Sequence, residues 1–227
     1  MDRKRRFSGK LPLVIFLSLF MLSPTLSRAL ADDLNPGLYS PDSSQFNRSY
    51  KDWTAKWWQW FMKIPNSQHP FEDSTGARCS VSQNGSVWFL LGSAGKVERN
   101  CTVPTNVAIL FPILNTECSY SEDASLKTEE DLRSCAVGGN AGAIVSASVD
   151  GREIKNIDKY RITSDVFPVV YSNDSIFPTN SNTSQAVSDG WFIFLEPLTS
   201  GSHEIKFNAA QLDPATVIDT TYHLTVK

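Results

Sequence analysis

Hydrophobic side chains recur at helical spacing over residues 46–64. One side of a helical wheel holds Phe46, Tyr50, Trp53, Trp57, Trp60, Phe61 and Ile64. This one-sided pattern predicts an amphipathic helix over residues 46–64 that packs on a sheet. Trp58 points away from the apolar stripe, so we expect it either to cover a second packing surface or to be exposed.

Short strand-like runs follow from residue 79 onward. The runs CSVSQ, SVWFLL and VERNCTV are separated by Asn84-Gly85 and by GSAG, which predicts a three-stranded meander. The continuous apolar run at residues 107–113 predicts a strand that is buried on both faces. Asp150-Gly151 predicts a hairpin turn. Further strands are predicted in YRITSDVF, PVVYS, GWFIFLEPL, HEIKF and VIDTTYHLTV, the last with Ile218, Thr220, Tyr222, Leu224 and Val226 on one side.

Two polar segments interrupt this strand pattern. The acidic stretch between Cys118 and Cys135 contains the capping-box spacing Thr128-x-x-Asp131, which predicts a short helix at residues 129–136. The segment between Tyr171 and Asp189 is rich in turn residues and predicts a long surface loop, and such loops are often functional or mobile.

Evenly spaced strands without alternating helices indicate a mainly β fold. We expect one antiparallel β-sandwich domain at residues 46–227, jelly-roll or immunoglobulin-like, with the tryptophan-rich helix and the short acidic helix packed on it. Residues 32–45 are turn-rich and are expected to form an extended arm.

The first 31 residues have the layout of a secretory signal peptide. A basic start is followed by an apolar run at residues 11–22 and by the small-residue step that ends at Ala31, where we expect cleavage. An uncleaved N-terminal anchor is the alternative, although the apolar run is short for a membrane span. No other apolar run of spanning length follows, so we expect no stable membrane span in the mature form.

Charge narrows the range of partners. Of 21 basic and 24 acidic residues, six basic and one acidic lie within residues 1–31, so the mature chain carries a net charge of −8. Nucleic acids and anionic membranes bind basic faces, so this charge disfavours both. We expect a protein that is secreted or held at the cell surface.

Four cysteines in an exported chain predict two disulfides. We favour the pairs Cys79–Cys101 and Cys118–Cys135, because each pair brackets one local unit. A zinc site is the rival interpretation, but the cysteine spacings match no zinc pattern. Glycosylation sequons begin at Asn47, Asn84, Asn100, Asn173 and Asn182, which is typical of surface loops in an exported protein.

Several stretches resemble those of an uncharacterised family of secreted bacterial and archaeal proteins. The resemblance rests on WTAKWWQW, TGARC with QNGSVWFLLG, NCTVPTNVAILFPILNTEC and VSDGWFIFLEPLTSGSHEIKF, and it covers most of the mature chain. It implies a W-x-x-x-W-W-x-W segment before a β-sandwich-like C-terminal part. It implies no activity, cofactor or site residue.

Aromatic side chains are the first candidates for ligand contact. Trp58, Trp88 and Trp191 lie near predicted surfaces and are suited to stacking on sugar rings if they are exposed. Core burial is the rival interpretation for each of them, and we favour it for Trp88 and Trp191 because their sequence neighbours are apolar.

Catalytic patterns are sparse in this sequence. No G-x-S-x-G elbow is present, and of the histidines, His69 lies in a predicted loop near acids while His203 and His223 lie in strand-like runs. We expect His69 to be solvated. A two-carboxylate glycosidase site needs no fixed spacing, and its candidates are Glu117, Asp150, Asp189 and Glu196. No metal site and no cofactor is expected.

The interpretation that best fits these patterns is a non-catalytic extracellular binding or surface-structural module, with carbohydrate as one candidate ligand and a cell-surface polymer or protein as partner. A secreted two-carboxylate hydrolase acting on polysaccharide is the alternative, and self-assembly through an exposed strand edge is a third. Trp58→Ala is expected to affect binding more than folding, whereas Trp57→Ala is expected to cost several kcal/mol of stability.

Overall fold

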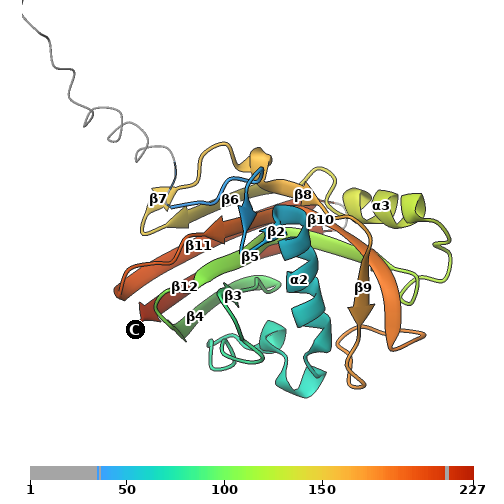
Figure 1. Cartoon of the computed structure of the whole chain (residues 1–227), viewed down its shortest axis with the longest axis horizontal. Helices are drawn as coiled ribbons and strands as arrows, with labels where there is room; N and C mark the ends of the chain where they lie inside the picture. The colour runs from blue at the N-terminus through green and yellow to red at the C-terminus, as the bar shows by residue number, and fades with distance from the viewer. Residues whose placement is uncertain (1–34, 36, 213–214) are drawn as a thin grey trace, which may run out of the picture.

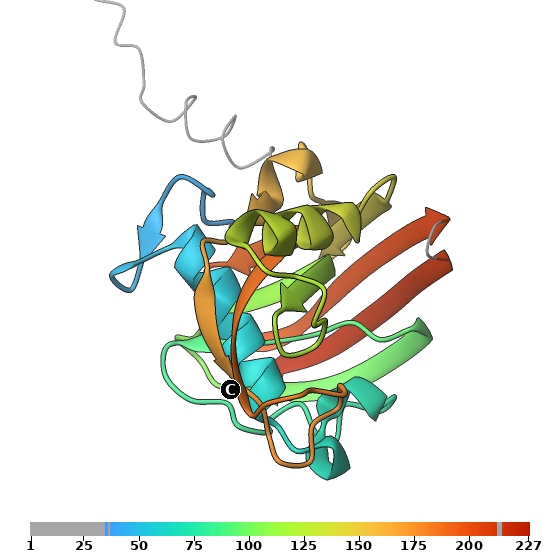
Figure 2. The same ribbon diagram turned by 90° about the vertical axis from the view of Figure 1, so that its right-hand side faces the viewer.

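Two β-sheets face each other, and a helix covers the outer side of one of them (Figures 1 and 2). This computed structural model describes residues 35, 37–212 and 215–227. The predicted signal peptide, residues 1–31, lies outside the described residues. The described part of the chain is mainly β with sheets packed together, as the strand pattern predicts.

The first sheet is built around two long neighbouring strands. Its order is β3 (Val87–Phe89), β5 (Ala108–Ser119), β10 (Thr183–Leu195) and β8 (Arg161–Thr163), and β9 (Phe167–Val170) also pairs with β10. The continuous apolar run in β5 is buried from Ala108 to Leu114 because both of its faces are covered.

The second sheet packs on one face of the first. Its order is β12 (Ala215–Val226), β11 (Gly201–Leu212), β6 (Ile144–Val149) and β7 (Arg152–Glu153), and β4 (Gly95–Val103) lies beside β12. The rings of Phe111 and Phe207 stack between the two sheets at 5.0 Å. The alternation predicted for the last strand is confirmed from Tyr222 to Val226, whereas Thr220 and Thr221 are both buried. The predicted turn at Asp150-Gly151 joins β6 to β7.

Helix α2 (Tyr50–Lys63) lies on the opposite face of the first sheet. It starts at a capping box in which Ser49 and Asp52 bond each other's backbone N–H. Trp57 meets Phe192 and Tyr50 meets Phe194, both on β10. The predicted helix start at residue 46 is wrong, because Phe46 and Asn47 have positive φ and form the turn between β1 (Ser44–Gln45) and β2 (Arg48–Ser49).

Helix α3 (Glu129–Gly138) covers the far ends of β5 and β10. The predicted capping box of Thr128 and Asp131 is present. Leu132 and Ala136 are fully buried in a small apolar cluster with Cys118 and Val187. The disulfide Cys118–Cys135 ties this helix to β5, and the second predicted disulfide, Cys79–Cys101, is also confirmed.

The predicted strand at residues 79–83 and the predicted three-stranded meander are both wrong. Residues 79–82 form turns and Gln83 is irregular, and β3 pairs in parallel with β5, so the three-stranded meander is absent from this part of the structure. After β3 the chain crosses between the sheets at residues 90–94 to reach β4.

The loop predicted between Tyr171 and Asp189 is shorter than expected, because β10 begins at Thr183. Three short 3-10 helices complete the fold: η1 (Asn66–Gln68), η2 (Pro70–Glu72) and η3 (Ile157–Tyr160).

Candidate functional site

The three tryptophans proposed for sugar stacking are buried. Trp58, Trp88 and Trp191 expose 6%, 9% and 4% of their surface, so the core burial favoured for Trp88 and Trp191 is confirmed and none of the three forms an exposed aromatic platform. Trp191 lies under the guanidinium of Arg161, which is 4.7 Å from the ring centre. Trp58 meets Trp57 and Phe61 edge-on. Of the two expectations for Trp58, a second packing surface is therefore correct and an exposed position is not.

A cavity of about 230 Å³ lies beside α2, and Trp58 is part of its wall. Its lining is almost entirely apolar and contains no acidic or basic side chain. It consists of Trp57, Trp58, Phe61, Phe71, Leu91, Gly92, Ser93, Ala94, Pro112, Ile113, Leu114, Asn115, Phe177, Thr216 and Ile218. These residues come from α2, η2, the 90–94 crossover, β5, β12 and the 171–182 loop, so the helix and a strand of each sheet contribute to the wall.

The β5 wall of the cavity departs from regular sheet geometry at Pro112 and Ile113. Ala108 N donates to Ser86 O and Leu90 N donates to Leu110 O, so alternate residues of β5 point their backbone groups at β3. Pro112 is next in this series, and it has no N–H to continue the ladder. The pairing of β5 with β10 also shifts by one residue at Ile113: Pro112 pairs with Phe192, whereas Leu114 pairs with Trp191. The interrupted ladder leaves room for the cavity.

The indole of Trp57 replaces the hydrogen bond that Pro112 cannot supply. Trp57 Nε1 donates to Leu90 O at 2.9 Å, and both groups are buried. This bond fixes the helix to the end of β3. Gly92 follows in the crossover, and a Cβ at that position would lie 3.1 Å from both Ile218 and Phe207, which explains the glycine.

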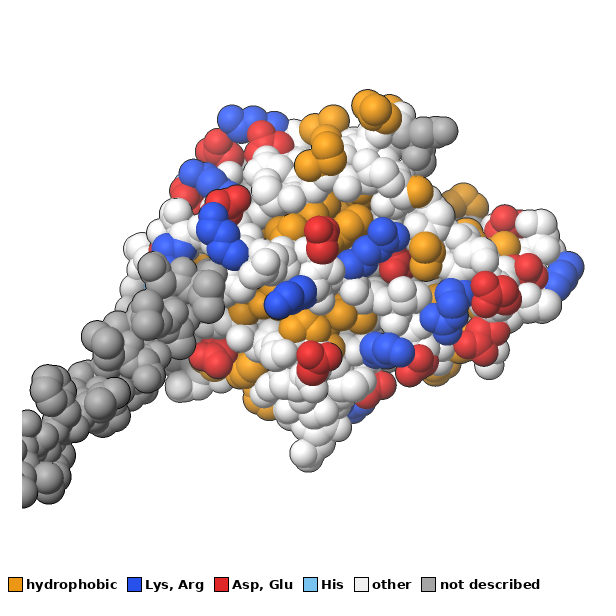
Figure 3. Space-filling model, turned by 90° about the horizontal axis from the view of Figure 1, so that it is seen from above, with side chains coloured by type: hydrophobic (Ala, Val, Ile, Leu, Met, Phe, Trp, Pro, Cys, Tyr) orange, Lys and Arg blue, Asp and Glu red, His pale blue; other side chains and the backbone are white. Residues whose placement is uncertain are grey.

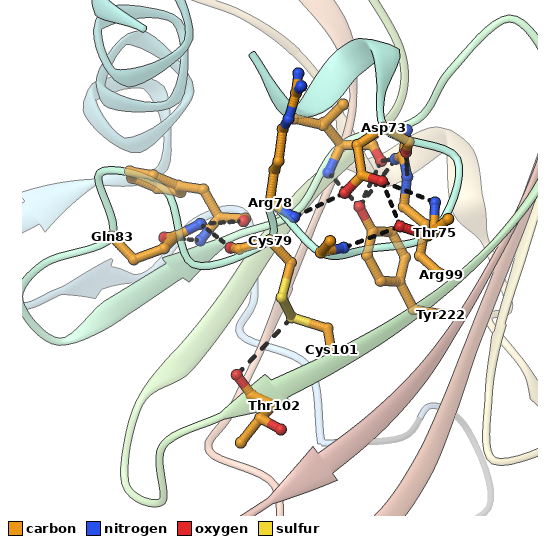
Figure 4. The surroundings of a disulfide bond; sticks show 12 residues. Asp73, Thr75, Arg78, Cys79, Gln83, Arg99, Cys101, Thr102 and Tyr222 are labelled. Atoms are coloured by element: carbon orange, nitrogen blue, oxygen red, sulfur yellow. Dashed lines mark hydrogen bonds between the residues drawn. A yellow bond between two sulfur atoms is a disulfide. The ribbon is translucent and has the colours of Figure 1, made fainter. Parts of the chain in front are cut away.

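A buried arginine fixes the opposite wall (Figure 4). Arg99 is 1% exposed, and its guanidinium donates to the carbonyls of Asp73, Leu91, Pro70 and Phe71 and to Tyr222 Oη. The Cys79–Cys101 disulfide lies next to this network. The segments that carry Phe71 and Leu91 are thereby held together on one side chain.

Two buried N–H donors at the cavity have no hydrogen-bond partner. They are Trp58 Nε1 and Asn115 Nδ2, and both residues line the cavity. An unpaired buried donor costs about 1–3 kcal/mol. These two groups therefore mark a place where an acceptor atom of a ligand would be favoured.

Polar side chains continue along the same face of β5 beyond Asn115. Glu117 and Ser119 follow at two-residue spacing, and Ser119 Oγ and Tyr171 Oη are 2.6 Å apart. Burial raises the pKa of Glu117 to about 9, with a further contribution from the nearby carboxyl of Glu122. Burial also raises the pKa of Glu122 and of Tyr171. Of the four carboxylates proposed from sequence, only Glu117 lies beside a second acid whose carboxyl is largely buried. That second acid is Glu122, which was not among the residues proposed from sequence.

The other proposed acids are occupied or exposed. Asp189 accepts hydrogen bonds from Arg161, Thr163 and Asn140 and is 1% exposed. Asp150 contacts His203 Nδ1 at 2.7 Å, and His203 Nε2 contacts Thr199 O at 2.9 Å, so both ring nitrogens are engaged. Although burial lowers the pKa of His203, the hydrogen bond with Asp150 raises it above its usual value.

His69 is fully buried, and the prediction of a solvated histidine is wrong. Its Nδ1 accepts a hydrogen bond from Phe71 N, and its Nε2 lies 3.1 Å from Phe61 O. The ring also packs on Phe61 at 4.3 Å. These contacts require the neutral ring with hydrogen on Nε2, and burial lowers the pKa of this histidine. His69 thus joins η2 to α2. His203 and His223 lie on β11 and β12, as predicted.

The surface bears on the predicted glycosylation sites, on charge and on the self-assembly hypothesis. The five sequon asparagines are all exposed. Figure 3 shows acidic and basic side chains mixed over the face that it presents. Ile144 and Val217 both lie opposite Ala210 in the second sheet, so they share its outer face, and both are exposed. An exposed apolar pair of this kind bears on the self-assembly hypothesis.

Among the described residues, no group of three or more histidine, cysteine, aspartate or glutamate side chains is arranged to hold a metal ion. No helix in the part of the chain that the structure describes is both long and apolar enough to cross a bilayer.

Comparison with models of protein families gives no match, and comparison with curated protein sequences gives none either. One solved structure, described as the structure of PbICP-C in complex with falcipain-2, matches 63% of this chain and all of its own chain, at 12% identity and a TM-score of 0.23. A likeness at this level supports no conclusion about fold or function.

Proposed function

We propose that this protein is a non-catalytic extracellular binding module whose cavity takes a compact apolar group that carries a hydrogen-bond acceptor. The observation that supports this proposal is the pairing of an apolar lining with two unpartnered donors, Trp58 Nε1 and Asn115 Nδ2. Small-molecule sites commonly combine a hydrophobic lining with a few polar groups that fix orientation. Two disulfides are in keeping with an exported location.

The size and lining of the cavity define the ligand class. An apolar cavity of about 150 Å³ binds benzene, so about 230 Å³ accommodates one ring with a small substituent. A sugar ring presents several hydroxyls, and the lining offers too few polar partners for them. We therefore favour an aromatic or branched aliphatic group with a carbonyl or ether oxygen over the carbohydrate considered from sequence.

The hydrolase alternative has less support. A glycosidase places its two carboxyls about 5 Å or more apart so that they flank the scissile bond. Glu117 and Glu122 instead lie close together, and neither lines the cavity.

The binding proposal is tested with two probes of similar shape. Acetophenone carries a carbonyl acceptor, and isopropylbenzene replaces that carbonyl with an apolar group. Each is titrated into the ¹⁵N-labelled protein, and the indole N–H signals are followed by NMR. We expect both to bind, with acetophenone about 3- to 10-fold tighter per hydrogen bond gained, and only acetophenone to add the downfield shift of a newly hydrogen-bonded indole N–H to the ring-current shift that either guest causes at Trp58.

The variants Trp58→Phe and Asn115→Leu serve as controls, because each removes a donor while keeping an apolar wall. Either one should reduce the preference for acetophenone. Equal affinity of the two probes for the wild type, or no saturable binding of either, would contradict the proposal.

A further inference from the structure

Unpartnered oxygens gather at the far end of β5, beyond the cavity. Glu117 is 8% exposed, and neither of its carboxyl oxygens has a hydrogen-bond partner. The neighbouring Glu122 has one buried oxygen, Oε1, that also lacks a partner. The two carboxyl groups lie within hydrogen-bonding reach of each other, and Glu122 also lies within reach of Tyr171, so a shared proton is the alternative to a bound ion for these buried oxygens.

A third side chain, independent of the acids, faces the same place. Ser188 on β10 lies directly opposite Glu117 in the ladder, so the two side chains share one face of the sheet. Ser188 is fully buried, and its hydroxyl has no hydrogen-bond partner. The bonded pair of Ser119 and Tyr171 closes the site along β5.

The chemistry of these atoms identifies what they would bind. Within the part of the chain that the structure describes, no salt bridge involves Glu117 or Glu122. The available atoms are carboxyl and hydroxyl oxygens, with no imidazole or thiolate among them. Such a set suits a hard cation, and flexible oxygen coordination completed by water is typical of calcium. Glu122 is partly exposed, so water can reach the site from its side.

We propose that Glu117, Glu122 and Ser188 hold a calcium ion. When the ion binds, the two acids release the protons that their buried position favours and supply the charge as carboxylates, while the serine hydroxyl and water complete the coordination. With only two carboxylates, the affinity should fall in the weak range of extracellular calcium modules, about 0.1–1 mM. The proposal stands independently of the ligand proposed for the cavity.

A calcium ion here would also hold the base of the 171–182 loop. Tyr171 begins this loop beside the two acids. Ser121, next to Glu122, bonds the backbone of Asn180 and Ser181 near the end of the loop. The ion would therefore join the turn after β5 to both ends of this segment.

Calcium binding is tested on the full mature protein after treatment with a chelator. Calorimetric titration with CaCl₂ and thermal unfolding with and without CaCl₂ are measured for the wild type, Glu117→Gln, Glu122→Gln and Glu130→Gln. Glu130 lies in the exposed acidic first turn of α3 and controls for non-specific surface binding. Terbium luminescence sensitised by a nearby tyrosine or tryptophan provides a second readout, since it requires the ion to lie close to an aromatic ring such as that of Tyr171.

We expect saturable binding with a midpoint near or below about 1 mM and a higher melting temperature in calcium, for both the wild type and Glu130→Gln. Both effects should be lost in Glu117→Gln and strongly reduced in Glu122→Gln. Glutamine has nearly the same shape as glutamate, and an unchanged circular dichroism spectrum would show that the variants fold. If the two acids merely share a proton, calcium will change neither the heat signal nor the melting temperature of the wild type, and the proposal fails. Equal binding by Glu117→Gln would also overturn it.

Discussion

Trp57 and Trp58 are adjacent on one helix and differ in their hydrogen bonding, which allows a sharp test of the cavity geometry. Trp57 Nε1 donates to Leu90 O, whereas Trp58 Nε1 has no partner. Both rings are almost fully buried. Replacing each by phenylalanine removes a similar apolar area, so the two variants differ mainly in the fate of the indole N–H.

The expected difference follows from the buried polar atoms. Trp57→Phe loses a hydrogen bond and leaves Leu90 O unsatisfied, at a cost of about 1–3 kcal/mol beyond the lost packing. Trp58→Phe removes a donor that has no partner and so recovers part of its packing loss. We expect Trp57→Phe to lower the free energy of unfolding by at least about 2 kcal/mol more than Trp58→Phe.

The measurement is urea unfolding followed by circular dichroism, which does not depend on tryptophan emission, with both disulfides intact. Trp53→Phe is a matched control, because Trp53 Nε1 donates to Gln45 O at a partly exposed position where water can take its place. Its extra cost should be smaller than that of Trp57→Phe. If Trp58→Phe proves as costly as Trp57→Phe, then Trp58 Nε1 is paired in solution and the polar argument for the cavity fails.

Three further predictions concern pH and packing. The pKa of Glu117 rises from 4.5 in the unfolded chain to about 9 in the folded chain, so its contribution to stability is complete below pH 4.5 and is lost as the pH rises to 9. Without calcium, the free energy of unfolding of Glu117→Gln should therefore increase by about 3 kcal/mol relative to that of the wild type between about pH 5 and pH 7, as measured by urea unfolding. Parallel pH profiles of the two proteins would refute this. The pKa of His69 is lowered by burial, so stability should fall as the pH drops below the unfolded value near 6.5, and the same assay should show a smaller fall in His69→Gln than in the wild type; an equal fall would contradict it. A Cβ at Gly190 would lie 2.5 Å from Asn115 Cβ, so Gly190→Ala should lose about 1–3 kcal/mol in thermal unfolding, whereas Gly138→Ala in α3, with nothing within 4 Å, should lose none; a tolerated Gly190→Ala would show that β5 and β10 lie further apart.

The elements that could be predicted are those specified by local chemistry. The capping box at Thr128 specified α3, and the apolar stripe specified α2. Both disulfide pairs were predicted from the local units that the cysteines bracket, although the segment between Cys79 and Cys101 does not form the predicted meander. The turn at Phe46 and Asn47 was missed because its positive φ values suit no hydrophobic pattern.

The candidate site depends on contacts between distant parts of the chain, which explains why most of it was missed. Glu122 follows Glu117 closely in sequence, yet only the turn after β5 brings the two acids together. His69 looked solvated because it is flanked by polar residues, although η2 folds it under Phe61. Pro112 is the one local signal that was available, since a proline inside an apolar run marks a bulge or a place where the strand has no ladder partner.

Arg99 has a consequence for how a molecule reaches the cavity. Its guanidinium clamps the segments that bear Phe71 and Leu91, so those walls are rigid before any guest arrives and little ordering entropy is lost on entry. Phe177 is carried by the 171–182 loop, which is attached at its ends. Phe177 is thus a lining residue that a loop carries, so we expect the rate at which a guest enters and leaves to respond to Phe177→Ala while the walls held by Arg99 keep their shape.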